Sequence, residues 1–215
     1  MTQAHLTDVE SILDAASDII QNDGYAAVSL PSIALRAGLT VEQVEEMFPT
    51  ANDAMVAMLN REFHGMYGLI VENIDRDPRG GLLSRMYTYI LSAVYERPLA
   101  KTLFVIDREA LNSIMRNASS YTYAPTIGIR SELIEALQSA GMVRADVDSR
   151  QISSILSVCS AGLALTAPHD DLGLIIDGLS TLLSRGVDAD VDDTTPGKTV
   201  FYDWATRLTL PKSDS

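Results

Sequence analysis

Cysteine is nearly absent from this chain of 215 residues, which contains only Cys159. A single cysteine excludes an intrachain disulfide, and chains without disulfides are typical of the reducing cytoplasm. The sequence contains no apolar run of about 18 residues or more, so we expect no transmembrane helix. The N-terminus lacks a basic stretch followed by an apolar block, so we expect no secretory signal and a cytoplasmic location.

Basic residues are scarce in the first quarter of the chain. Lys and Arg together number 16 against 29 Asp and Glu, which gives a net charge of −13. Residues 1–60 contain one base, Arg36, and nine acids: Asp8, Glu10, Asp14, Asp18, Asp23, Glu42, Glu45, Glu46 and Asp53. Acidity alone is common in soluble proteins. Its concentration in one segment predicts a strongly negative N-terminal region.

Motifs for metal binding or catalysis are also missing. The histidines, His5, His64 and His169, have no metal-ligand spacing. We find no Ser/His/Asp arrangement, phosphate loop or paired-carboxylate motif. Cys159 lies in an apolar helical stretch, which is typical of a buried thiol rather than a nucleophile. We therefore predict no enzymatic activity, no metal and no cofactor.

Helical periodicity dominates what the sequence does contain. Apolar residues at spacings of three and four predict a first helix: Val9, Ile12, Leu13, Ala16, Ile19 and Ile20. Ser29 can cap a second helix, and Gly38 allows the turn that follows it. Thr40 and Gln43 form a capping box for a short third helix, which ends before Pro49. This order predicts a helix-turn-helix.

The rest of the chain also predicts helices, and no sustained alternating stretch indicates a sheet. We expect a head over residues 1–50 and a helical domain over 51–187, whose first helix, 51–74, connects the two. The later helices are predicted at 82–96, 99–117, 126–140, 148–166 and 171–186. An acidic, solvated linker is expected at 188–199, followed by a short helix and tail at 200–215.

A family pattern is visible in the first 60 residues. It comprises Gly24-Tyr25, Val28-Ser29, Ile33-Ala34, Arg36-Ala37-Gly38-Leu39-Thr40 and Phe48-Pro49. This pattern resembles the N-terminal domain of TetR-family transcriptional regulators, and residues 141–148 are more weakly similar to the loop before the family's dimerisation helices. The resemblance implies an all-α homodimer. Its helix-turn-helix head would bind operator DNA, and its C-terminal domain would dimerise and hold a small ligand.

The third helix departs from that family pattern. By resemblance, DNA contacts would come from Ser29, Arg36, Thr40, Val41, Gln43 and Glu45. Val41 stands where lysine is usual, and Glu45 stands where tyrosine is usual. Affinity for phosphate comes from Lys and Arg, whereas Glu42, Glu45 and Glu46 would meet like charge. These three glutamates are therefore also a candidate acidic face for a protein partner.

The family resemblance also suggests a pocket for a small apolar ligand. Its candidate residues are Tyr89, Phe104, Asp107, Met115, Tyr121 and Tyr123. Ordinary core packing is the alternative explanation for most of them.

Two helices carry the candidate dimer interface. Its residues are Ile152, Ile155, Leu156, Cys159 and Leu163 in the first helix, and Ile175, Leu179 and Leu182 in the second. A two-fold four-helix interface would use these stripes. The alternative is that they pack within one subunit.

Three functional hypotheses remain open at this stage. The chain is a regulator that binds operator DNA directly, or a regulator that acts through a protein partner or as a DNA mimic. The third hypothesis is a small-molecule-binding protein on the same scaffold. The family pattern favours the first, and the charge of the head favours the second.

Overall fold

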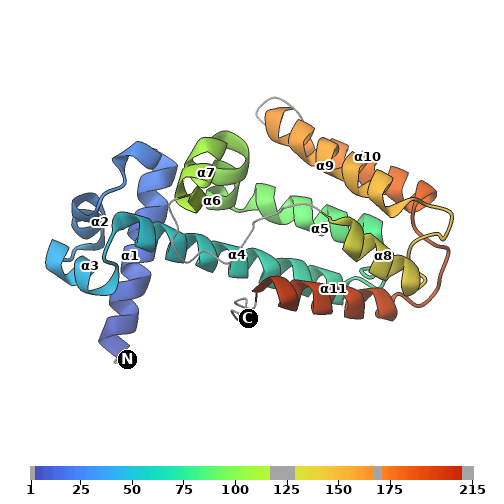
Figure 1. Ribbon diagram of the computed structural model, residues 1–215, viewed down its shortest axis with the longest axis horizontal. Helices are drawn as coiled ribbons and strands as arrows, with labels where there is room; N and C mark the ends of the chain where they lie inside the picture. The colour runs from blue at the N-terminus through green and yellow to red at the C-terminus, as the bar shows by residue number, and fades with distance from the viewer. Residues whose placement is uncertain (1–2, 117–128, 167–170, 210–215) are drawn as a thin grey trace. The chain divides into compact units, whose positions relative to one another are not determined.

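The structure, a computed structural model, describes residues 3–116, 129–166 and 171–209, and these form helices and no β-strand (Figure 1). The helices are α1 (Gln3–Asn22), α2 (Leu30–Ala37), α3 (Val41–Met47), α4 (Ala51–Arg76), α5 (Leu83–Glu96), α6 (Pro98–Lys101), α7 (Arg108–Arg116), α8 (Ser131–Ser139), α9 (Ser149–Thr166), α10 (Leu172–Gly186) and α11 (Thr195–Thr209). A 3-10 turn, η1 (Tyr25–Ala27), and a π-helical turn, η2 (Thr102–Ile106), lie between them. The predicted all-α fold class is confirmed.

The chain divides into two compact units. Unit 1 comprises Met1–Gly65 and Arg97–Tyr121, and unit 2 comprises Met66–Glu96 and Thr122–Ser215. The division falls inside α4, which therefore contributes residues to both units. Unit 1 includes α6, η2 and α7 as well as the helix-turn-helix, whereas the sequence placed residues 97–121 with the C-terminal domain.

Unit 1 has a small apolar core centred on α1. Ile12, Ala16 and Ile19 of α1 are buried, as the periodicity predicts. Ile33 of α2 and Val44 of α3 are also fully buried in this unit. The three helices thus form the small core expected of a helix-turn-helix head.

Unit 2 has a larger core, to which α5 contributes extensively. Leu83, Met86 and Tyr87 of α5 are almost completely buried. Helix α11 packs in the same unit, where Trp204 meets Tyr67 edge-on with ring centroids 6.5 Å apart. These contacts account for the apolar stripes of α5 and α11.

The predicted helix over residues 99–117 is interrupted. Helix α6 ends at Lys101, the π turn η2 follows, and Asp107 leaves the helical region with φ −126° and ψ 73°. Asp107 Oδ1 accepts a hydrogen bond from the backbone amide of Ala110 at 2.9 Å. Aspartate competes for backbone amides in this way, which favours a cap over a helix interior. Asp107 therefore starts α7.

The last helix begins at Thr195, five residues before the predicted start at 200. Residues 195–199 are therefore helical and not part of a linker. Asp193 Oδ1 accepts a hydrogen bond from the amide of Thr195 at 2.9 Å, and Thr194 Oγ1 donates to the carbonyl of Pro78 at 2.8 Å. Asp188 is buried as well. The acidic composition suggested solvation, but long-range contacts hold both ends of this segment.

Candidate functional site

The helix-turn-helix is fixed by two capping boxes and one glycine. Ser29 Oγ accepts from the amide of Ser32 at 3.2 Å, and Ser32 Oγ accepts from the amide of Ser29 at 2.9 Å. The same exchange joins Thr40 and Gln43 at the start of α3, at 3.3 and 2.9 Å. Gly38 has a φ of 71°, in the left-handed region that favours glycine. The predicted capping box at Thr40 is confirmed.

Arg36, the only base among the first 60 residues, is paired with two acids of the head. Its Nη1 donates to Asp18 Oδ2, and its Nη2 donates to Asp23 Oδ2 at 2.6 Å. Hydrogen bonds to Asp18 and then to Asp23 raise the pKa of Arg36 further above its ordinary value. Arg36 is a candidate phosphate contact, but two carboxylates of the head already compensate its charge.

The next base along the chain, Arg61, is bound in the same way. Its Nη1 lies 2.6 Å from Glu10 Oε2, and its Nη2 lies 2.7 Å from Asp14 Oδ1. Both arginines of residues 1–65 therefore pair with acids on or just after α1. The acidity of α1 serves to hold α2 and α4, a role that the sequence analysis did not predict.

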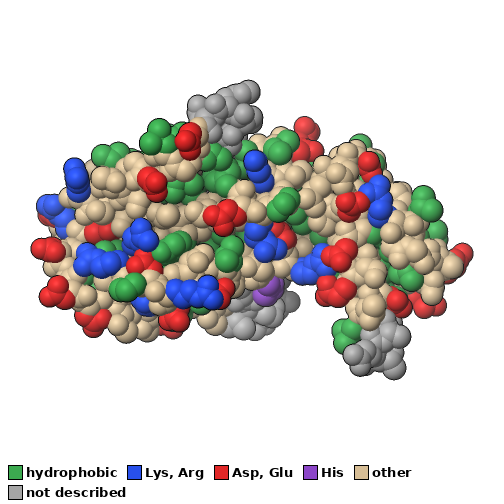
Figure 2. Space-filling view, turned by 180° about the vertical axis from the view of Figure 1, so that it is seen from behind, with side chains coloured by type: hydrophobic (Ala, Val, Ile, Leu, Met, Phe, Trp, Pro, Cys, Tyr) green, Lys and Arg blue, Asp and Glu red, His purple; other side chains and the backbone are tan. Residues whose placement is uncertain are grey.

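The exposed side of α3 carries Glu42, Glu45 and Glu46. At about 100° per residue these three positions cover an arc of roughly 100°, and buried Val44 lies nearly opposite Glu42. The pKa of Glu42 is lowered by its own backbone amide and then by the Thr40 hydroxyl, which favours the charged form. On the face that Figure 2 draws, acidic side chains outnumber basic ones over unit 1, at the right.

The candidate residues for an apolar pocket are divided between the two units. Phe104 packs edge-on against Phe63 in unit 1, with ring centroids 5.6 Å apart. Tyr89 belongs to unit 2, where its hydroxyl donates to Asp77 Oδ2 at 2.7 Å. Met115 is half-buried on α7, and Asp107 caps that helix. Tyr121 and Tyr123 lie outside the described residues. The apolar pocket therefore stays a prediction.

The candidate dimer residues of α9 and α10 divide into inward and outward groups. Leu156 and Leu163 are only 2% and 4% exposed and pack in the core of unit 2. Ile152, Ile175 and Leu179 are partly buried against that core, and Cys159 is half-buried.

Ile155 and Leu182, by contrast, are 55% and 69% exposed. Val158 and Leu174, which the sequence analysis did not select, are each 72% exposed. Helical periodicity predicts stripes on α9 and α10 but does not tell which stripe faces the core.

Comparison with solved structures shows the fold of most of the chain. A fatty acid degradation regulator, FadR, from Bacillus halodurans shares 15% identity at a TM-score of 0.56 and covers 83% of this chain and 95% of its own. A TetR-family transcriptional regulator from Haemophilus influenzae shares 14% identity at a TM-score of 0.54, covering 87% of this chain and 100% of its own. The repressor SmeT of a Stenotrophomonas maltophilia multidrug efflux pump shares 18% identity at a TM-score of 0.57, covering 86% and 92%. The chain has the TetR-type fold.

Sequence comparison alone does not reach this conclusion, since no protein-family model and no curated protein matches the chain. The identities to the TetR-type structures are low, so they establish the architecture and not the chemistry of its sites.

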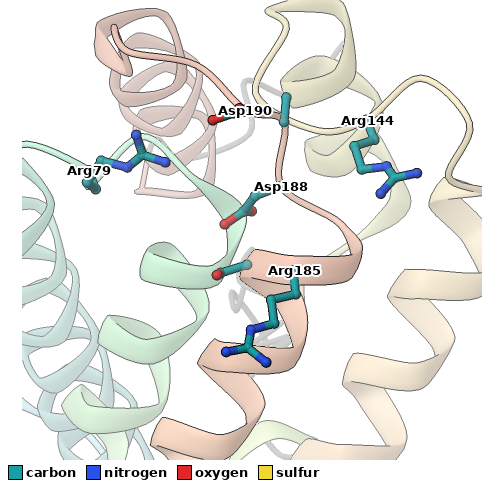
Figure 3. A pocket seen from close by; sticks show the side chains of 7 residues that line it. Arg79, Arg144, Arg185, Asp188 and Asp190 are labelled. Atoms are coloured by element: carbon teal, nitrogen blue, oxygen red, sulfur yellow. The ribbon is translucent and has the colours of Figure 1, made fainter.

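A polar pocket of about 450 Å³ lies in unit 2 of this TetR-type fold. Four separate segments line it: Arg79, Arg144, the pair Ser184 and Arg185, and residues 188–190. Figure 3 shows the side chains of Arg79, Arg185 and Asp188 within it. No sequence motif marks this site, because its residues come from turns that are far apart in the chain.

Within residues 3–116, 129–166 and 171–209, no helix is both long and apolar enough to span a bilayer. Those residues also contain no cluster of three His, Cys, Asp or Glu side chains that could hold a metal ion.

Proposed function

We propose that this chain is a homodimeric TetR-like transcriptional regulator, responsive to a small apolar ligand in the cytoplasm, whose head does not bind DNA on its own. One observation carries the second half of this proposal. Arg36 is paired with Asp18 and Asp23, while the exposed side of α3 presents Glu42, Glu45 and Glu46.

Electrostatics supports this proposal. Nonspecific DNA affinity comes from Lys and Arg side chains that release counterions from the phosphates. Both arginines of residues 1–65 are compensated by carboxylates. The glutamates of α3 would enter a polyanionic groove, and repulsion is only partly screened over the Debye length of about 8 Å at physiological salt. One glutamate can accept from a cytosine amino group, but three on one face repel the duplex.

The regulatory role rests on the kind of protein that shares the fold. The structures named above are described as a fatty acid degradation regulator, a TetR-family transcriptional regulator and an efflux-pump repressor. None of these descriptions names an enzyme, which supports a role without catalysis.

The homodimer is supported by the exposed apolar side chains of α9 and α10. Ile155 and Val158 of α9 and Leu174 and Leu182 of α10 are large apolar residues that are more than half exposed. Exposed apolar surface of this kind is typical of an interaction site. A second copy of unit 2 would cover it with the same residues, as a two-fold interface requires.

A second function follows from the same acidic face. Glu42, Glu45 and Glu46 are all exposed and carry no basic neighbour within α3. A basic surface on a protein partner would complement them, and the head would then act through that partner or in place of DNA. The apolar ligand remains a prediction of the family resemblance.

Fluorescence anisotropy with labelled duplex DNA tests the proposal. The purified protein is titrated against its own upstream region and an unrelated duplex, from about 20 to about 300 mM salt, a range over which phosphate binding falls steeply. We expect no binding to either duplex even at the lowest salt. Binding at low salt that disappears as salt rises would overturn the proposal and restore an ordinary operator-binding regulator.

A further inference from the structure

The geometry of the polar pocket in unit 2 points to a binding site for a small oxyanion, held by Arg79 and Arg185. This site differs in place and chemistry from the proposed apolar ligand pocket. Its ligand class is a phosphate or carboxylate group.

The walls of the pocket are fixed by long-range backbone contacts. The amide of Arg144 donates to the carbonyl of Val187 at 3.0 Å, and the amide of Ala189 donates to the carbonyl of Met142 at 3.0 Å. An isolated β-bridge joins Val143 to Asp188. The pocket is therefore preorganised, which reduces the entropic cost of binding a small ligand.

Arg79 and Arg185 differ from the other arginines around them. Arg85 is paired with Asp77, and Arg144 with Asp146 through two hydrogen bonds. Over the described part of the chain, neither Arg79 nor Arg185 forms an ion pair, although the charge of Arg79 acts to lower the pKa of nearby Asp188. Arg79 Nη1 donates to the carbonyl of Val191 at 2.7 Å, which positions its guanidinium and leaves other N–H groups available.

Arg79 and Arg185 line the same pocket from two separate segments. Figure 3 shows the Asp188 carboxylate between these two side chains, and Arg144 on the other side of the segment that carries Asp188 and Asp190. Ser184, which also lines the pocket, adds a hydroxyl donor. The planar, fixed donors of arginine match the oxygens of phosphate and carboxylate groups.

Asp188 opposes such a ligand only in part, because both of its oxygens accept hydrogen bonds from Ser84. It is only 7% exposed, and its Oδ1 and Oδ2 accept from the amide and hydroxyl of Ser84 at 3.2 and 2.5 Å. Ser84 lies in the first turn of α5, where the helix dipole favours negative charge. Asp190 is exposed and solvated. The carboxylate of Asp188 still opposes an anion, so its neutral replacement should strengthen binding.

Isothermal titration calorimetry with inorganic phosphate tests the site, with sodium chloride at equal ionic strength as the reference and acetate as a carboxylate probe. We expect saturable binding of phosphate or acetate, and the stronger of the two identifies the ligand class. Chloride-matched titrations in which neither probe saturates would overturn the proposal.

Variants of the exposed arginines locate the site. The double change Arg79→Gln and Arg185→Gln should weaken binding about tenfold or more, since each guanidinium supplies charge-assisted hydrogen bonds. Asp188→Asn should strengthen binding several-fold. Arg207→Gln, an exposed arginine of α11 outside the pocket, is the matched control. Equal losses in the control, or unchanged affinity in the double variant or in Asp188→Asn, would place the anion elsewhere.

Discussion

Arg36 Nη1 donates to Asp18 Oδ2, and this ion pair joins α2 to α1. Asp23, just after α1, takes the second amino group of the same guanidinium at 2.6 Å. A residue that the family resemblance assigns to DNA phosphate therefore serves to hold two helices of the head together. Mutation of these acids therefore changes the charge of the head and allows its effect on DNA affinity to be measured.

Releasing Arg36 should raise DNA affinity. The double change Asp18→Asn and Asp23→Asn removes two negative charges and frees one guanidinium. We expect measurable binding at low salt, with a slope of log affinity against log salt of about −1 for one phosphate contact. Adding Arg36→Gln should abolish that gain. Asp192→Asn with Asp203→Asn gives the same change of net charge outside the head, and an equal gain there would show that position is irrelevant.

Neutralising or reversing the acidic face of α3 should have a larger effect. Glu42→Gln, Glu45→Gln and Glu46→Gln together should permit salt-sensitive DNA binding. Their replacement by Lys should steepen the salt dependence by up to about 3 in slope, for three added phosphate contacts.

Anisotropy measures both triple variants. A variant neutralised at Glu132, Asp192 and Asp203, all exposed outside the head, serves as the control. DNA affinity that stays absent in both α3 variants would reject the idea that these glutamates block DNA.

Acidic side chains on the exposed side of α10 should separate the proposed dimer. Leu174→Glu with Leu182→Glu removes two apolar side chains, each contributing about 1.5–3 kcal/mol when buried, so the dimer dissociation constant should rise at least about 100-fold. Sedimentation velocity over a concentration series measures it. Leu35→Glu makes the same chemical change at an 85% exposed leucine of α2 and should leave association unchanged. Wild-type protein that sediments as a monomer would refute the interface.

A methyl group at Gly81 should destabilise unit 2. Its Cβ would lie 1.8 Å from the carbonyl oxygen of Thr194, so the turn before α5 and the start of α11 would have to separate. We expect Gly81→Ala to lower the free energy of unfolding by about 3 kcal/mol, as severe overpacking does. Gly68→Ala in α4, where a Cβ meets nothing within 4 Å, should raise it by about 0.5–1 kcal/mol. Urea denaturation followed by circular dichroism compares the two.

The carboxyl group of Asp188 should contribute a pH dependence to stability. Burial raises its pKa above the ordinary value of Asp, although the hydrogen bonds from Ser84 oppose that rise. The folded protein therefore holds this proton more tightly than the unfolded chain. The resulting stability is complete below the ordinary pKa of Asp, about 3.9, and is lost as pH rises through the folded value.

Asp188→Asn removes that loss. The variant should therefore gain stability relative to the wild type as the pH rises from about 4, near the ordinary pKa of Asp, to about 7. Urea denaturation at both pH values measures the difference. A variant that loses relative stability as pH rises would contradict the direction of this pKa shift.

The sequence predicted the local features of the head well, because each depends on neighbours a few residues away. The Thr40–Gln43 capping box, the turn at Gly38 and the buried face of α1 all follow from short spacings. It failed where local patterns are ambiguous. Asp107 reads as one polar residue in a helical stretch, yet its carboxylate caps α7.

The sequence by itself determined the all-α class, the helix-turn-helix and the excess of acid in the head. Periodicity, capping residues and residue counts are properties of the chain, so they can be identified from the sequence alone. Only the tertiary structure decided that Asp18 and Asp23 hold Arg36, that Leu156 faces inward while Ile155 faces outward, and that Arg79 and Arg185 line one pocket. These pairings join residues far apart in the sequence or select one helix face among several, and packing of whole helices sets both.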